Sequence, residues 1–232
     1  MTTRDVKAGG RISSRSYDAS GRRQASARRR ERIIRAARER FLADGYGATT
    51  MAAVADDAGV SVETVYKTFR NKPGLVRAVW ERALEGSAAT PAEERADAVS
   101  ATATDPRLIL HNWATLAAEV AAVAGPVFRL VRAAAESDPA AAELYAEVEA
   151  GRADRMAHNA AYLVRGGHLR DGLGADQARD ILTAMSVALY EPLVERGQWS
   201  AEEYSELIYR LLCAALLPDP PTQSRGVGSP SA

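Results

Sequence analysis

Side chains able to bind a polyanion gather in one short stretch of this 232-residue chain. Hydroxyl groups, including that of tyrosine, and cationic groups donate hydrogen bonds to phosphate oxygens and to the edges of bases in a DNA groove. Residues 61–72 supply both types, so contact with nucleic acid is the chemistry that suits them. The candidate DNA-contacting residues of this stretch are Ser61, Val62, Glu63, Thr64, Tyr66, Lys67 and Lys72.

Two short helices joined by a turn would hold these side chains on one face. Thr50, itself a candidate DNA contact, fits the N-cap of a helix over residues 51–58. Gly59 ends that helix because glycine adopts the left-handed conformation without a Cβ penalty. Ser61 then caps a second helix over residues 62–69. The pattern predicts a helix-turn-helix unit whose second helix enters the major groove of DNA.

The stretch from Ala53 to Leu75 resembles the DNA-binding signature of the TetR family of bacterial transcriptional repressors. The matching positions are Ala55, Ala58, Gly59, Val60, Ser61, Thr64, Tyr66, Phe69, Lys72 and Leu75. The resemblance is close over residues 31–81. It implies a homodimer whose N-terminal domain binds a double-stranded DNA operator and whose C-terminal domain binds a small-molecule effector.

The charge of the chain is divided unevenly. Residues 1–80 hold 17 Lys and Arg against 8 Asp and Glu, a net charge of +9. The remaining residues hold 13 against 22, a net charge of −9. The positive charge therefore accompanies the helix-turn-helix, as in a polyanion-binding module joined to a more acidic domain.

An all-α protein with two domains is expected from the length, the abundant alanine and the helical spacing of apolar residues. Residues 28–85 should form the helix-turn-helix domain with a connecting helix. Residues 86–217 should form a helical ligand-binding and dimerisation domain. Residues 1–27, a basic tail, and residues 218–232 are expected to be disordered because they contain few apolar residues to bury.

Arg28, Arg29 and Arg30 lie where the basic tail meets the first helix. They either belong to a solvated tail or form an arm that enters the minor groove beside the recognition helix. The sequence leaves both interpretations open, and the three arginines are kept as candidate DNA contacts.

Capping signals and apolar spacing predict the other helices. A first helix should span residues 31–45, and a connecting helix, with Asn71 as its candidate N-cap, should run to about residue 85. The expected helices of the second domain cover residues 106–123, 127–136, 139–164, 175–196 and 201–217. Gly125 and Pro126 are expected to separate the first two of these, because proline disrupts a helix interior.

Large apolar and aromatic residues of the central helices either pack the core or line a cavity, and the sequence does not separate the two. The family resemblance implies a cavity for a small, often apolar, effector. The candidate ligand-binding residues are His111, Trp113, Leu116, Phe128, Val131, Tyr145, Met156, Asn159, Tyr162 and Tyr190.

The last two predicted helices carry wide apolar faces. These faces either pack in the chain's own core or, as the resemblance implies, form a four-helix interface between two subunits. The candidate dimerisation residues are Ile181, Met185, Leu189, Leu193, Tyr204, Leu207, Ile208, Leu211 and Leu212.

The sequence holds no constellation for catalysis or metal binding. His111, His158 and His168 are far apart in the chain, and Cys213 is the only cysteine. No catalytic residue, metal ion or cofactor is therefore expected. No stretch approaches the roughly 18 apolar residues of a membrane span, and the N-terminus lacks the apolar core of a signal peptide. A cytoplasmic protein without a membrane partner is expected.

These observations predict a ligand-responsive transcriptional repressor that binds a palindromic operator as a dimer and is released by a small, apolar effector. One alternative is a helical small-molecule carrier or enzyme with a vestigial helix-turn-helix. Another is a ligand-blind DNA binder or activator on the same fold. Ser61, Thr64, Tyr66 and Lys72, all intact, favour the repressor over the carrier or enzyme.

Overall fold

The computed structural model describes residues 14–85, 90–187 and 189–219, and the regular elements in these residues are all helical. The chain divides into two compact units, Met1–Val76 and Arg77–Ala232. The division falls inside the connecting helix, at Arg77, and not after it at residue 86 as the sequence indicated. The expected all-α class and the presence of a helical second domain are confirmed.

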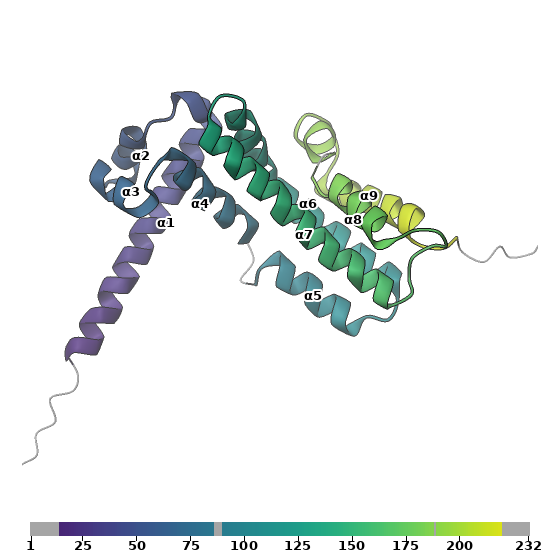
Figure 1. Ribbon diagram of the computed structural model, residues 1–232. Coiled ribbons are helices and arrows are strands. Elements are labelled where there is room, and N and C mark those ends of the chain that lie inside the picture. Colours follow the sequence, from purple (N-terminus) through teal and green to yellow (C-terminus); the bar gives the residue numbers. More distant parts are fainter. Residues whose placement is uncertain (1–13, 86–89, 188, 220–232) are drawn as a thin grey trace, which may run out of the picture. The chain divides into compact units, whose positions relative to one another are not determined.

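The first unit contains α1 (Ser14–Ala48), α2 (Met51–Ala58), α3 (Val62–Phe69) and the start of α4 (Lys72–Glu85). α1 packs against α2, and α2 packs against α3 (Figure 1). The helical conformation of α1 breaks at Gly45, where φ is 79°. The break lies where the first helix was predicted to end. The fully buried side chains of this unit include Ile33, Phe41, Val54 and Val65.

The basic tail that the sequence predicted to be disordered is helical from Ser14 onward. Residues 1–13 lie outside the described residues, as do residues 220–232 of the expected C-terminal tail. Alanine, arginine and glutamine favour helix, and a helix nucleated by buried residues extends at little cost per residue. Residues 21–32 are exposed and are followed by the buried Ile33, and the part of α1 before Ile33 projects from its unit (Figure 1).

The second unit continues from α4 and consists of α5 (Ala92–Thr102), α6 (Pro106–Ala135), α7 (Pro139–Arg165), α8 (Ala175–Met185), the π-helical turn η1 (Glu191–Glu195) and α9 (Ala201–Leu216). α6 and α7 run side by side at its centre (Figure 1). α5 and α9 pack on α6, and α8 packs on α7. Ile109, Leu163 and Leu216 are among its fully buried residues.

Two helix boundaries differ from the prediction. α6 continues through Pro126, which was expected to break it. Proline removes one helical hydrogen bond, but Val127 and Phe128 directly after it are buried, and their burial keeps the segment in place. The helix expected over residues 175–196 instead ends at Met185, and the chain resumes as η1. Pro192 lacks an N–H group for the helix there.

α6 is long and apolar enough to cross a membrane by length and composition, with a mean hydropathy of 1.5 over an 18-residue window. The expectation that no segment approaches this limit was therefore wrong. Of that window, 56% is buried inside the protein, and the core helix of a globular unit passes the same test.

Candidate functional site

Capping side chains position the exposed helix α3. The Thr50 hydroxyl accepts a hydrogen bond from the Ala53 N–H at 3.1 Å, and Gly59 ends α2 in the left-handed conformation, with φ 63° and ψ 45°. The Ser61 hydroxyl accepts from the Thr64 N–H at 3.3 Å and lies 3.1 Å from the Thr64 hydroxyl. The predicted caps and turn are confirmed, and Thr64 is held by the cap of its own helix.

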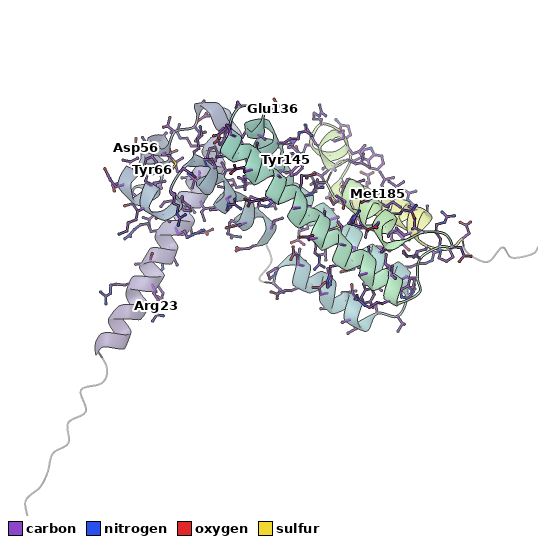
Figure 2. All side chains as sticks on the ribbon, in the orientation of Figure 1. Arg23, Asp56, Tyr66, Glu136, Tyr145 and Met185 are labelled. Carbon is purple, nitrogen blue, oxygen red and sulfur yellow. The ribbon has the colours of Figure 1, made fainter. Side chains whose placement is uncertain are left out.

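α3 has one buried side and one exposed side. Val65 and Phe69 are buried, whereas Tyr66 is 50% exposed. Tyr66 is labelled in Figure 2. Glu63, Lys67 and Thr68 are exposed, and Val62 and Thr64 are half-buried. Thr68 is also exposed on this helix but was not among the residues chosen from the sequence. Its hydroxyl donates to the Thr64 carbonyl at 2.7 Å. Its position one helical turn after Thr64 was the available signal.

Glu63 contributes a negative charge to this otherwise polar and cationic face. Hydrogen bonding from its own backbone N–H, and then from the Ser61 hydroxyl, lowers the pKa of the Glu63 carboxyl below its ordinary value. The helix N-terminus favours an anion at this place. The carboxylate therefore stays ionised at neutral pH.

Lys72 is tied to the corner between α1 and α2. Its Nζ donates to the Gly47 carbonyl at 3.2 Å and lies 4.3 Å from the centre of the Tyr46 ring. Beside it, Asn71 Oδ1 accepts from the Gly74 N–H at 2.8 Å, which confirms the predicted cap of α4. Lys72 thus fastens the start of α4 to the first unit, a role that the sequence did not indicate. Its predicted phosphate contact remains a prediction.

The three candidate arginines occupy different environments. The Arg30 guanidinium lies 5.2 Å from the centre of the Phe69 ring, at the end of α3. Arg28 and Arg29 are exposed on the projecting part of α1, where Figure 2 also shows Arg23. Arg30 therefore contacts the end of α3, whereas the other two are exposed on the projecting part of α1, and whether they belong to an arm or a tail stays a prediction.

The second unit contains a cavity of about 320 Å³ lined by residues from α4 through α9. Among the predicted ligand-binding residues, Trp113, Leu116, Met156 and Asn159 line it. Sequence reasoning missed several other lining residues: Trp80, Leu84, Arg152, Arg155, Leu182 and Ser186. Helical spacing was the available signal for two of them, because Arg152, Arg155 and Asn159 share one face of α7.

The other predicted ligand-binding residues lie elsewhere in the second unit. Phe128 is buried, with its ring centre 6.1 Å from that of Trp80 and 5.8 Å from that of Tyr145, and Val131 is fully buried. These residues pack the core, which was the alternative interpretation. Tyr190 stacks edge-on against Tyr204 at 5.0 Å, the Tyr162 hydroxyl donates to the Ala103 carbonyl at 3.5 Å, and the exposed His111 contacts the ring of Tyr209 at 5.2 Å.

The predicted dimerisation residues differ in how deeply they are buried. Tyr204, Ile208 and Leu212 are 0%, 1% and 3% exposed, so they pack in the chain's own core and cannot present area to a partner. Met185, Ile208 and Leu212 also line the cavity. The half-buried residues of the set are Ile181, Met185, Leu189, Leu193, Leu207 and Leu211.

Acidic and histidine side chains are dispersed in the part of the chain that the structure describes. Within those residues, no group of three or more His, Cys, Asp or Glu could hold a metal ion. His158 lies 3.4 Å from Asp97, which also accepts two hydrogen bonds from Arg155. The Arg155 guanidinium is the main cause of the lowered pKa of the Asp97 carboxyl. This cluster is an ion pair that joins α5 to α7.

Comparison with known proteins places the helix-turn-helix in a family. Residues 33–79 match the model of the bacterial regulatory proteins of the tetR family. YvkB, an HTH-type transcriptional regulator of Bacillus subtilis (strain 168), is 43% identical over 49 residues, which cover 21% of this chain and 26% of YvkB. The alignment thus spans about a quarter of that relative.

Solved structures resemble the chain over most of its length. NalD, the secondary repressor of the MexAB-OprM multidrug efflux pump in Pseudomonas aeruginosa, is 20% identical with a TM-score of 0.66, and the match covers 84% of this chain and 99% of NalD. A TetR/AcrR-family transcriptional regulator from Thermobifida fusca YX-ER1 is 25% identical with a TM-score of 0.58, covering 79% and 96%. Both are regulators, the non-enzymatic class that the sequence predicts.

Proposed function

We propose that this chain, which belongs to the TetR family of bacterial regulatory proteins, is a cytoplasmic transcriptional repressor that binds a palindromic operator and releases it when a small, mostly apolar effector binds. The observation that carries the proposal is α3, a capped helix that exposes Tyr66, Glu63 and Lys67 and is anchored by buried Val65 and Phe69. A short helix with such a face fits the major groove. Repression, not activation, is favoured by the resemblance to NalD, which is a repressor.

The proposed repressor acts as a homodimer. One short recognition helix contacts too few bases for specificity, and two copies related by a two-fold axis read a palindrome. The half-buried apolar residues of α8 and α9, such as Ile181, Leu207 and Leu211, are the surface we assign to the subunit contact.

Two neighbouring residues of α9 test this surface. Leu207 is half-buried, whereas Ile208 is 1% exposed. Leu207→Glu should convert the dimer to a folded monomer with weak operator binding, measured by sedimentation and circular dichroism. Ile208→Glu should instead unfold the protein because it buries a charge. If the Leu207→Glu variant remains a dimer, the subunit contact does not lie on this surface.

α4 is the element we propose for coupling effector to operator. Its first residue, Lys72, holds the corner of the DNA-binding unit, and further along the same helix Trp80 and Leu84 line the cavity. A ligand that contacts those two side chains therefore acts on the helix that leads to the recognition helix. Typical coupling of about 1–3 kcal/mol changes operator affinity by about 5- to 150-fold, and DNA must weaken effector binding by the same factor.

Mapping the DNA sites that the protein occupies tests the proposed function. Footprinting of those sites should show two protected half-sites on one face of the duplex, about one turn or more apart. A single protected half-site without dyad symmetry, bound by a monomer, would contradict the proposal. Sites located beside their own regulated genes would also point to the chemistry of the effector.

A filling variant tests the role of the cavity. Ala117 lines the cavity on α6, and Ala122 is exposed on the same helix. Ala117→Met should abolish the response to an effector while operator affinity stays unchanged, and Ala122→Met should respond as the wild type does. Equal responses from both variants would show that the effector binds elsewhere.

A further inference from the structure

The lining of the cavity is mostly apolar and includes a few polar and charged side chains of the surrounding helices. Trp80, Trp113, Leu116 and Met156 represent its apolar lining. The polar and charged lining residues are Glu93, Glu147, Arg152, Arg155, Asn159 and Ser186. A volume of about 320 Å³ lies within the roughly 300–1,000 Å³ that is usual for small-molecule sites. The chemistry of the polar residues therefore decides which small molecules of this size fit.

The two arginines of the cavity already have partners. Arg152 pairs with Glu149, donates to the Ser186 hydroxyl at 2.8 Å and to the Thr183 carbonyl at 3.3 Å, and lies over the ring of Phe128. Arg155 donates to both carboxylate oxygens of Asp97, at 2.7 and 3.2 Å. Neither guanidinium is left to neutralise a ligand carboxylate.

The two acidic residues of the lining also decide whether a charged ligand can bind. Glu147 pairs with Arg77, and Glu93 is exposed. Arg152, Arg155 and Glu147 are ion-paired, so none of the three has a charge left to neutralise a charged ligand. Moving either kind of ion out of water without a new partner is costly. The charge arrangement therefore selects an uncharged molecule.

Asn159 differs from these residues because its polar atom is unpaired. The residue is 6% exposed and lines the cavity, and its Oδ1 is buried without a hydrogen-bond partner among the described residues. Buried acceptors are nearly always paired, and an orphaned one is destabilising. A ligand donor that reaches this oxygen from the cavity would satisfy it.

We infer that the cavity binds a small, uncharged, mostly apolar molecule whose hydroxyl group donates a hydrogen bond to Asn159 Oδ1. This inference rests on the proposed effector function and specifies the ligand class. Asn159 acts as the specificity-determining residue, because an apolar ligand without a donor leaves its oxygen unpaired.

Pairs of isomeric probe molecules test the effect of the hydroxyl group alone. n-Decanol and methyl nonyl ether have the same formula, as do p-butylphenol and butyl phenyl ether, but only the first member of each pair is a donor. Calorimetric titration of the full-length protein should show each hydroxyl compound binding about two- to tenfold more tightly than its ether, the ratio expected for one net hydrogen bond. Decanoate and p-butylbenzoate should bind more weakly than the ethers.

Asparagine variants supply a matched control. Asn112 Oδ1 is also buried and has no hydrogen-bond partner within the part of the chain that the structure describes, but Asn112 does not line this cavity. Asn159→Leu should reduce the hydroxyl-to-ether ratio to about one, whereas Asn112→Leu should preserve it. The inference is overturned by equal binding within both wild-type pairs, by tightest binding of a carboxylate, by a ratio that survives Asn159→Leu, or by failure of both hydroxyl compounds to bind.

Operator affinity is measured in the same samples by fluorescence anisotropy, and this separates the inference from the function on which it rests. Hydroxyl-selective binding that leaves operator affinity unchanged would uphold the ligand class and contradict effector-driven release. Release of DNA without any hydroxyl preference would contradict the ligand class and uphold release.

Discussion

At the scale of single residues, Lys72 combines a contact inside the first unit with the predicted contact to DNA. Lys72→Met loses the hydrogen bond to the Gly47 carbonyl and the contact with the Tyr46 ring. It should lower the free energy of unfolding by about 1 kcal/mol, measured by urea denaturation. It should also reduce the slope of log affinity for DNA against log salt by about one unit.

Lys67→Met is the matched control for Lys72, because Lys67 is exposed on α3. It should reduce the salt slope similarly while the free energy of unfolding changes by less than about 0.5 kcal/mol. Equal stability of the two variants would show that the Lys72 contacts do not stabilise the fold.

Glu63 belongs to the same scale, and its charge is predicted to restrict binding to the right sequences. Glu63→Gln should raise the affinity for random DNA and thereby weaken the preference for the operator. The difference between the two binding free energies should shrink by roughly 1–3 kcal/mol if a base contact is lost. Because the pKa of the Glu63 carboxyl is lowered, it stays ionised as pH falls toward its ordinary range, so Glu63 should not itself cause a gain in random-DNA binding between pH 7 and 5.

Glu39→Gln provides the same charge change at an exposed position of α1. Anisotropy titrations with operator and random duplexes should show little change in preference for this variant. A loss of preference as large as that of Glu63→Gln would mean that overall charge, not position on α3, decides the effect.

At the scale of elements, the projecting part of α1 is predicted to be a DNA-binding arm that the fold does not need. Residues 21–32 are exposed, and Ile33 after them is buried. Removing residues 1–29, which keeps Arg30 on the Phe69 ring, should change the free energy of unfolding by less than about 0.5 kcal/mol. Operator affinity should fall, with about 0.9 lost from the salt slope for each phosphate contact removed.

A full-length variant with Arg28→Gln and Arg29→Gln separates charge from length in this arm. It should reproduce part of the lost salt dependence without shortening α1. If the truncated protein binds the operator as tightly as the full chain at every salt concentration, the projecting helix is a tail and not an arm.

At the scale of the whole molecule, Tyr204 couples the stability of the second unit to alkaline pH. It is fully buried, and burial raises the pKa of its hydroxyl to about 12, from 10.0. Below pH 10 the group is protonated in both folded and unfolded chains, so its contribution is intact. Between pH 10 and 12 the unfolded chain loses the proton and the folded chain keeps it, and stability should fall by up to about 2–3 kcal/mol.

Tyr204→Phe should flatten this alkaline decline in urea unfolding experiments between pH 8 and 11.5. The hydroxyl of Tyr204 has no hydrogen-bond partner among the described residues, so its removal should leave stability at pH 7 equal or higher. Tyr66→Phe, at an exposed position, should retain the decline. A decline that persists in Tyr204→Phe would assign it to other groups.

The sequence by itself determined the local chemistry of the DNA-binding unit. Thr50, Gly59, Ser61 and Asn71 were each assigned to a cap or turn that the structure contains. Capping depends on side chains and backbone groups within a few residues of each other, so the order of residues is sufficient information. The inward and outward faces of α3 followed from helical periodicity for the same reason.

Only the tertiary structure decided how deeply each residue is buried, which residues it contacts and where the helices are interrupted. Periodicity placed Leu207 and Ile208 together on one apolar face, but packing against α6 buries Ile208 and leaves Leu207 half-buried. Pro126 was tolerated because its neighbours are buried on both sides, which a local rule does not see. Arg152 and Arg155 line the cavity and are held by Thr183 of α8 and Asp97 of α5, which lie far away in the chain. Burial and pairing of this kind depend on contacts between distant segments, and these exist only once the helices have packed.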